Sequence, residues 1–414
     1  MKRGIALEGG GAKGAFQVGA MKAIQELELT YDGVVGASIG AINGALIAMG
    51  DMALLEKIWL SVEAKDMIKG DPILLEKIIK LDFSGDITAI REVVIETIKQ
   101  GGLDVTPYKN YLKTHIDEAA IRKSNIAYGL VTLSLTDLKP IEIFVEDIPE
   151  GKLHDYIIAS ANFPAFKSEK IDNKRLVDGG FFDNCPINML LEKGYDEVIA
   201  IRIMGIGRIR KVKKEHQDKV IYITPSEDLG KTLEIDPVKA KYNMKMGYFD
   251  TLKVLSSLKG DQYYLKDNVD EASIFKKLSD LPDDFVGGLM ETLNYDGMIP
   301  RRFLFEVFMP LLGEVLGLKK TATYGDMLIA YYEALADLAE IDRFKLYTLE
   351  TFAEEVTRQY RKKDDVLIKE LDSLSVSLLS FIKATGISVM PSKQKKLFLK
   401  YVMALSLKFG VSFV

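Results

Sequence analysis

The sequence predicts an α/β fold, with a mainly parallel sheet sandwiched between helices, followed by an all-helical region. A strand, loop and helix pattern spans residues 3–28, and the same pattern repeats over 31–49, which predicts the first part. After about residue 260 the strand-like runs stop and helical spacing takes over, which predicts the second. We therefore expect a boundary near 260–265, between a 1–260 domain and a 261–414 helical domain of unknown role.

The first repeat contains a short apolar run at 3–8 that ends in glycines, and then a helical pattern at 14–28. In the second repeat, residues 31–36 form the expected strand, Ser38 follows it, and 39–49 form a helix rich in Ala and Gly. Such a helix can pack closely on a sheet. The other expected elements are strands at 126–135, 141–145, 197–203 and 219–223, and helices at 301–316, 324–340, 350–388 and 392–410.

Composition excludes several classes of protein. The 414 residues carry a formal net charge of only −5, with the charges scattered, so no nucleic-acid-binding surface is indicated. The single cysteine, Cys185, excludes an internal disulfide and a multi-cysteine metal site. The N-terminal apolar run is too short for a signal peptide, and no run reaches the length of a membrane span. We expect a cytoplasmic protein whose contact with lipid is peripheral.

Three consecutive glycines stand in the loop Gly9-Gly10-Gly11-Ala12-Lys13-Gly14, between the first strand and the first helix. They allow backbone N–H groups to turn toward one point at the positive end of a helix dipole, which suits an anion or an oxyanion. The same loop matches the G-x-G-x-x-G pattern of dinucleotide-binding domains. By itself it leaves both interpretations open.

A second motif separates these interpretations. Gly36-Ala37-Ser38-Ile39-Gly40 is a G-x-S-x-G between a predicted strand and a predicted helix, the context of a nucleophile elbow. A dinucleotide-binding domain would instead place an acidic residue near the end of this strand to hold the ribose. A Walker loop would follow Gly14 with Lys and Ser or Thr, whereas Ala15 and Phe16 stand there. The pattern favours Ser38 as a nucleophile.

A serine nucleophile needs a base close to it. The three histidines, His115, His154 and His216, lie in no strand-end loop, so we expect them at the surface. The better candidate is Asp178, which ends a short apolar run and is followed by two glycines, Gly179 and Gly180. The alternative for Asp178 is an ordinary Asx turn.

The three motifs in this order resemble the patatin-like phospholipase family: a G-G-G-x-K/R-G loop, a G-x-S-x-G elbow and a D-G-G/A loop. The segment 159–164 resembles the family's A-S-x-x-x-P, and 222–229 with Gly247-Tyr248 resembles the end of its domain. The resemblance covers about residues 1–260. Glu8 stands where the family commonly has Asp, and Lys13 where Arg is commoner; both substitutions keep the charge.

The resemblance implies a three-layer α/β/α patatin-like sandwich and a Ser-Asp dyad. Asp178 would accept the Ser38 proton, Ser38 would form an acyl-enzyme, and water would release the fatty acid, with no metal or cofactor. The N–H groups of Gly10, Gly11 and Ala12 would hold the oxyanion, and Lys13 would help hold their loop. The implied substrates are acyl esters of phospholipids or lysophospholipids. The supporting glycines are Gly9, Gly14, Gly36, Gly40, Gly179 and Gly180.

Two other functions stay open. An acyltransferase of the carrier-protein transacylase type is disfavoured because such enzymes have G-H-S-x-G, whereas Ala37 precedes the serine here. Acyl transfer to an alcohol other than water is still open with the same dyad. The other alternative is a nucleotide-binding or regulatory module that uses the glycine-rich loop and meets a partner through its helical region.

Two basic stretches bear on partners. From Ser373 to Val414 there is no acidic residue, and this basic, apolar end could lie on an anionic bilayer, although solvated lysines on a packed helix pair are the favoured explanation. The second stretch is a loop that we expect to be solvated. The sequence leaves homo-oligomerisation open. The residues are Lys383, Lys393, Lys395, Lys396, Lys400 and Lys408 in the first stretch, and Arg208, Arg210, Lys211, Lys213 and Lys214 in the second.

Overall fold

The computed structural model divides into two compact units, Met1–Leu255 and Ser256–Val414. Pro164 and Lys383 from the sequence motifs, and most of the predicted helix beyond 362, lie outside the described residues. The structure describes residues 1–63, 69, 97, 102–163, 166–167, 170–171, 173–266, 269–295, 297–362, 373, 375–376, 378 and 391–414.

An eight-stranded mixed sheet forms the centre of the first unit, in the order β5-β6-β3-β2-β1-β7-β8 with β4 beside β3. The adjacent strands β3, β2, β1, β7 and β8 run parallel to one another. The strands β4 and β6 pair antiparallel with β3, and β5 pairs antiparallel with β6. The predicted mainly parallel sheet is therefore confirmed. The bounds are β1 Arg3–Leu7, β2 Gly33–Ala37, β3 Ala127–Ser134, β4 Lys139–Phe144, β5 Lys170–Ile171, β6 Lys174–Asp178, β7 Glu197–Ile201 and β8 Val220–Ile223.

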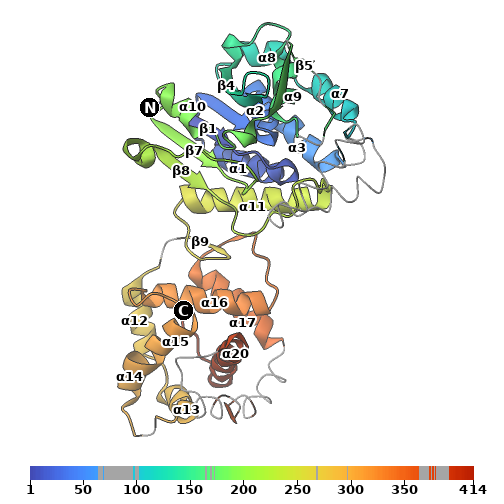
Figure 1. Cartoon of the computed structure of the whole chain (residues 1–414). Coiled ribbons are helices and arrows are strands. Elements are labelled where there is room, and N and C mark those ends of the chain that lie inside the picture. The colour runs from blue at the N-terminus through green and yellow to red at the C-terminus, as the bar shows by residue number, and fades with distance from the viewer. Residues whose placement is uncertain are drawn as a thin grey trace. The chain divides into compact units, whose positions relative to one another are not determined.

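Helices cover both faces of this sheet, which gives the predicted three layers (Figure 1). On one face α2 (Ile39–Met49) packs so closely that Gly44 lies against Leu7 and Val34. On the other, α10 (Ile187–Glu192) packs with Ala6 and Val35 in a buried apolar cluster. Adjacent strand residues thus point to opposite helical layers, as expected for strands buried on both faces. Further helices are α3 Met52–Ser61, α7 Thr106–His115, α8 Glu118–Lys123 and α9 Leu153–Ser160.

The first helix of the unit, α1 (Ala15–Glu26), packs against its last, α11 (Pro237–Leu255). A Cβ atom added at Gly19 would lie 1.8 Å from the carbonyl oxygen of Met244, and one at Gly247 would lie 1.9 Å from that of Phe16. Only glycine allows the two backbones to approach this closely. The sequence did not predict α11, because scattered lysines interrupt the apolar spacing over these residues.

The described part of the second unit is helical apart from the short parallel pair β9 (Tyr264–Leu265) and β10 (Leu346–Tyr347). Its buried core is rich in aromatic side chains, among them Phe285, Phe308 and Phe352. The predicted helix 301–316 contains a π-helical turn over Leu304–Phe308. The helices are α12 Glu271–Ser279, α13 Asp283–Leu293, α14 Pro300–Phe303, α15 Met309–Val315, α16 Tyr324–Leu338, α17 Leu349–Arg361 and α20 Ser392–Phe409.

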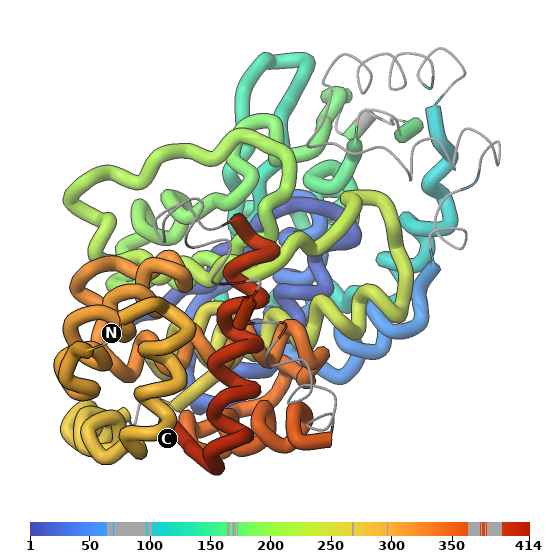
Figure 2. Tube along the Cα trace, turned by 90° about the horizontal axis from the view of Figure 1, so that it is seen from below, coloured from blue at the N-terminus to red at the C-terminus, as the bar shows by residue number. Residues whose placement is uncertain are grey.

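The basic helix α20 packs against α13, α16 and α17 within this unit, and Figure 2 shows it as the long red helix. Its apolar residues, including Phe398, Val402 and Leu405, are buried in the core. The lysines Lys393, Lys396 and Lys408 are exposed. The helix therefore has no unpacked apolar side for a bilayer in this conformation. Within the described ranges, no helix is both long enough and apolar enough to cross a membrane.

Candidate active site

Ser38 stands at the turn between β2 and α2, where the backbone has a conformation that serine rarely adopts, with φ 53° and ψ −127°. The glycines on either side make the turn sterically possible. A Cβ atom at Gly36 would lie 2.3 Å from the carbonyl carbon and oxygen of Gly40, and one at Gly40 would lie 2.4 Å from the carbonyl oxygen of Leu7. The turn holds Ser38 at the N-terminus of α2 as a nucleophile elbow does.

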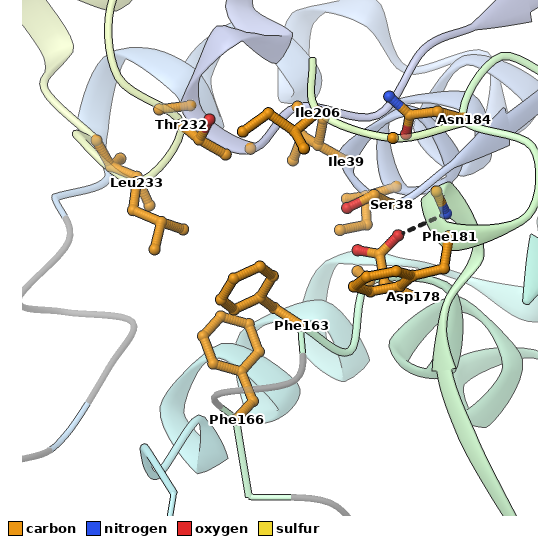
Figure 3. Close-up of a pocket in the computed structure, with 18 of the residues that line it drawn as sticks. Ser38, Ile39, Phe163, Phe166, Asp178, Phe181, Asn184, Ile206, Thr232 and Leu233 are labelled. Carbon is orange, nitrogen blue, oxygen red and sulfur yellow. Dashed lines mark hydrogen bonds between the residues drawn. The ribbon is translucent and has the colours of Figure 1, made fainter. Parts of the chain in front are cut away.

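Asp178 ends β6 and reaches Ser38 because of the strand order. β6 pairs with β3, where Asp178 lies opposite Thr132, and β3 is also the neighbour of β2. The Ser38 hydroxyl lies close enough to the Asp178 carboxylate to lower its pKa. The N–H of Gly180 donates a hydrogen bond to this carboxylate, 2.8 Å from Oδ1. Figure 3 shows Ser38 and Asp178 facing each other, with Phe181 beside the carboxylate.

Burial controls the charge of this carboxylate. Asp178 is only 8% exposed, and the loss of water raises its pKa from 3.8 to about 6, although the nearby Ser38 hydroxyl and the hydrogen bond from Gly180 act in the opposite direction. Near neutral pH most of the carboxylate is ionised, and it is a stronger base than an ordinary aspartate. A base with a pKa near the working pH is well suited to take a proton from a hydroxyl.

The glycine-rich loop presents two of its three predicted oxyanion donors to the same site. No described residue accepts a hydrogen bond from the N–H of Gly10 or Gly11, and both residues line the pocket at Ser38. The N–H of Ala12, in contrast, donates to the carbonyl oxygen of Thr232 at 2.7 Å. The N–H of Ala12 is therefore not free to donate to an oxyanion as predicted, because it already donates to Thr232, which is far away in the sequence.

A pocket of about 410 Å³ opens at these groups. Most of its lining is apolar, with Ile39 on one side and Leu233 on another, and the rings of Phe163 and Phe166 together (Figure 3). Tyr108 also lines it, and burial together with the Asp178 charge raises the pKa of its hydroxyl. A long apolar chain can enter such a pocket and lie beside the Ser38 hydroxyl.

Residues 5–191 match the family model for patatin-like phospholipase. This part of the chain is a patatin-like phospholipase domain. Patatin-like phospholipase domain-containing protein 7 of Mus musculus is 27% identical over 202 residues, 48% of this chain and 13% of that protein. Lysophospholipase NTE1 of Cryptococcus neoformans var. neoformans is 25% identical over 215 residues, 49% of this chain and 11% of that protein. The alignments thus span a small part of these relatives.

Among solved structures, VipD from Legionella pneumophila is similar to this chain with a TM-score of 0.36 and 14% identity, over 98% of this chain and 92% of that one.

None of the histidines lines the pocket of the patatin-like domain. The Nδ1 atom of His115 lies 2.8 Å from the carbonyl oxygen of Tyr111, and the Nε2 atom of His154 lies 2.8 Å from that of Ile116. His216 lies in the short 3₁₀ segment Lys214–Lys219. The titratable side chain that faces Ser38 in the pocket is therefore a carboxylate and not an imidazole (Figure 3).

Two charged residues, Glu8 just before the glycine-rich loop and Lys13 within it, make contacts that hold this loop in position. The buried Glu8 carboxylate is paired with Arg202 at 2.9 Å and accepts the N–H groups of Ile203 at 2.6 Å and Met204 at 3.0 Å. Lys13 donates from Nζ to the carbonyl oxygen of Met204 at 3.2 Å. Both residues tie the loop to the segment after β7, so their effect on the site is indirect.

Three residues that support this arrangement were not assigned roles from the sequence. The Ser160 hydroxyl donates to the carbonyl oxygen of Val131 at 2.7 Å and accepts the N–H of Ser38 at 3.2 Å, so it fixes the backbone of Ser38. Asn184 donates from Nδ2 to the carbonyl oxygen of Gly9 at 3.0 Å and accepts the Gly9 N–H with its own carbonyl at 2.9 Å. The third residue is Thr232, whose carbonyl oxygen accepts the N–H of Ala12. The A-S-x-x-x-P motif included Ser160 but did not indicate what this residue does.

The basic loop after β7 is not uniformly solvated. Arg210 pairs with Glu142 at 2.8 Å and with Glu192 at 3.6 Å, and its guanidinium lies over the ring of Phe182. Arg208 is exposed and lines the pocket. Lys211, Lys213 and Lys214 are exposed or partly exposed. The three lysines are thus solvated as expected. Of the two arginines, Arg210 is held in ion pairs and Arg208 lies at the pocket.

Proposed function

We propose that the patatin-like domain hydrolyses fatty-acyl esters of phospholipids or lysophospholipids, with Ser38 as nucleophile and Asp178 as base. The observation that carries this proposal is that the Ser38 hydroxyl and the buried Asp178 carboxylate face each other in one apolar pocket (Figure 3). The similarity to the fungal lysophospholipase NTE1 supports the substrate class. The absence of all three histidines from the lining of this pocket supports a dyad without imidazole.

In the first half of the reaction, Asp178 takes the proton of the Ser38 hydroxyl as its oxygen attacks the ester carbonyl carbon. The carbonyl oxygen becomes an oxyanion, which the N–H groups of Gly10 and Gly11 stabilise. Each such donor contributes about 3 kcal/mol to the stability of the transition state. When the tetrahedral intermediate collapses, the bond to the leaving alcohol breaks, and the alcohol takes its proton from Asp178.

In the second half, water attacks the acyl carbon of the Ser38 ester. Asp178 accepts a proton from this water, the tetrahedral intermediate forms at the same two N–H groups, and the bond to Ser38 breaks. The serine recovers its proton from Asp178, and the fatty acid leaves. An alcohol that replaces water in this step would give acyl transfer with the same residues.

We also propose that peripheral contact with lipid is made by the rim of the pocket. Phe181 is 53% exposed and Ile206 52%, both line the pocket, and Met204 close by is 57% exposed. Sedimentation with anionic vesicles should fall for Ile206→Ser and stay at the parent level for Val238→Ser, which replaces an apolar residue that is 78% exposed elsewhere in the unit. Equal sedimentation of the two variants would contradict this proposal.

The direct test of the dyad is labelling with a fluorophosphonate, which reacts with an activated serine, followed by mapping of the modified peptide. We expect the label on Ser38 and expect Ser38→Ala and Asp178→Asn to lose both labelling and hydrolysis of a short-chain lysophospholipid. Ser61→Ala, which removes an exposed hydroxyl on α3, is the matched control. Full hydrolysis by either dyad variant, or a label on another serine, would refute the assignment.

A further inference from the structure

Arg208 is the one cationic side chain among the residues that line the described pocket. The other side chain there that carries a full charge near neutral pH is Asp178, and the rest are apolar or neutral. A phospholipid brings a negative phosphate close to its acyl esters, and the ionised Asp178 repels that phosphate. A cation on the pocket wall offsets this repulsion.

The position of Arg208 is fixed relative to the dyad through its backbone. Its N–H donates to the carbonyl oxygen of Gly180 at 2.9 Å, and its own carbonyl accepts the N–H of Asn184 at 2.6 Å. Gly180 in turn donates its N–H to Asp178, and Asn184 holds Gly9 of the oxyanion loop. The segment that carries Arg208 is therefore attached to both halves of the reaction site.

The guanidinium of Arg208 differs from those of its neighbours in having no acidic partner. Arg202 pairs with Glu8 and Arg210 pairs with Glu142, whereas no described residue forms an ion pair or side-chain hydrogen bond with Arg208. The side chain is exposed. Its five N–H donors stand ready for an oxyanion, and a planar guanidinium matches the geometry of phosphate oxygens in a two-point contact.

We propose that Arg208 binds the phosphate of the phospholipid whose acyl ester lies at Ser38, and thereby makes the site prefer phosphate-bearing lipids over neutral acylglycerols. This proposal rests on the proposed hydrolase function for its reaction, but the phosphate contact itself involves binding alone. Because the phosphate is present in both the bound substrate and the transition state, loss of the contact should raise KM more than it lowers kcat.

The experiment compares hydrolysis of a hexanoyl lysophosphatidylcholine and of monohexanoylglycerol, both kept below micelle formation so that adsorption to a lipid surface plays no part. We expect Arg208→Gln to lower the ratio of kcat/KM for the phosphate substrate over the neutral one by about ten- to a hundredfold. Arg208→Lys should recover part of the ratio. Lys211→Gln, an exposed cation of the same loop that does not line the pocket, should keep the parent ratio. An unchanged ratio in Arg208→Gln overturns the proposal.

A binding measurement separates this proposal from the proposed function. An ether-linked lysophosphatidylcholine has no ester to cleave, and Trp59, the single tryptophan of the chain, lines the pocket and reports its occupation by fluorescence. Weaker binding by about tenfold or more in Arg208→Gln supports the phosphate contact even if the parent protein hydrolyses no ester. Equal affinity in the parent and the variant, or no binding to the parent, overturns it.

Discussion

Replacing Asp178 by Asn should make the stability difference between the variant and the parent protein depend on pH. The buried carboxyl group has a pKa of about 6 in the folded protein, against an ordinary value of 3.8. A raised pKa means that the folded state holds the proton more tightly than the unfolded state does. Below pH 3.8 the carboxyl is protonated in both states, and above pH 6 the folded state bears the full cost of a buried charge.

The size of the effect follows from these two values. At high pH the buried charge costs about 3 kcal/mol of folding free energy, since each pKa unit corresponds to about 1.4 kcal/mol. Between about pH 4.5 and about pH 7.5 the cost grows by about 2 kcal/mol. Asn carries no charge at either pH. The stability of Asp178→Asn relative to the parent should therefore increase by that amount over this range, whatever the substitution does to the hydrogen bonds at both pH values.

Urea unfolding followed through Trp59 measures this difference, because the tryptophan is buried in the unit that contains Asp178. Asp183, whose pKa burial raises to about 7, titrates in the same range, but it is present in both proteins and cancels. Asp218→Asn makes the same chemical change at an exposed position and is the matched control. A stability difference between Asp178→Asn and the parent that does not change with pH, or that shrinks as the pH rises, would refute the reasoning.

Three further predictions concern the same unit. If the Asp178 carboxylate is the base, kcat/KM for ester hydrolysis should rise with pH and reach half its plateau near pH 6; a profile that stays level down to about pH 4.5 would argue against it. Gly40→Ala places a Cβ atom 2.4 Å from a backbone oxygen of β1 and should lower stability in urea by about 1–3 kcal/mol, whereas Gly44→Ala on the same helix meets side-chain atoms at 3.3 Å and should change it by less than about 1 kcal/mol. Glu8→Ala leaves Arg202 and two backbone N–H groups without their acceptor and should lower stability by about 3 kcal/mol; a loss as small as that of an exposed ion pair would contradict its buried role.

The sheet and the approximate elements could be predicted because their signals are local. Parallel strands that alternate with helices place their carboxyl ends at one edge, and the loops after β1 and β2 lie at that edge. The glycines around Ser38 predicted a tight turn, and that turn is present at the predicted position. In the second unit, apolar spacing predicted the helices but carried no sign of the two-residue pair of β9 and β10.

The contacts that complete the site could not be predicted, because they join loops far apart in the sequence. The hydrogen bond from Ala12 to Thr232 joins residues near the two ends of the first unit's sequence. Nothing in the glycine-rich motif indicates that the N–H of Ala12, unlike those of its neighbours, already has an acceptor. Asn184 holds Gly9 through one amide, and a single asparagine has no periodic signal. Likewise, Arg208 and Arg210 look alike in a basic loop, and only the positions of Glu142 and Glu192 separate them.

The packing of α1 on α11 has a consequence for how the protein is made. The two helices are the first and the last α-helices of their unit, and their backbones come close together at Gly19 and Gly247. During translation at roughly 5–20 residues per second, α1 leaves the ribosome on the order of 10 s or more before α11 is synthesised. Over that interval the side of α1 that packs on α11 has no partner from that helix, so the unit cannot complete its fold until its last helix has been made.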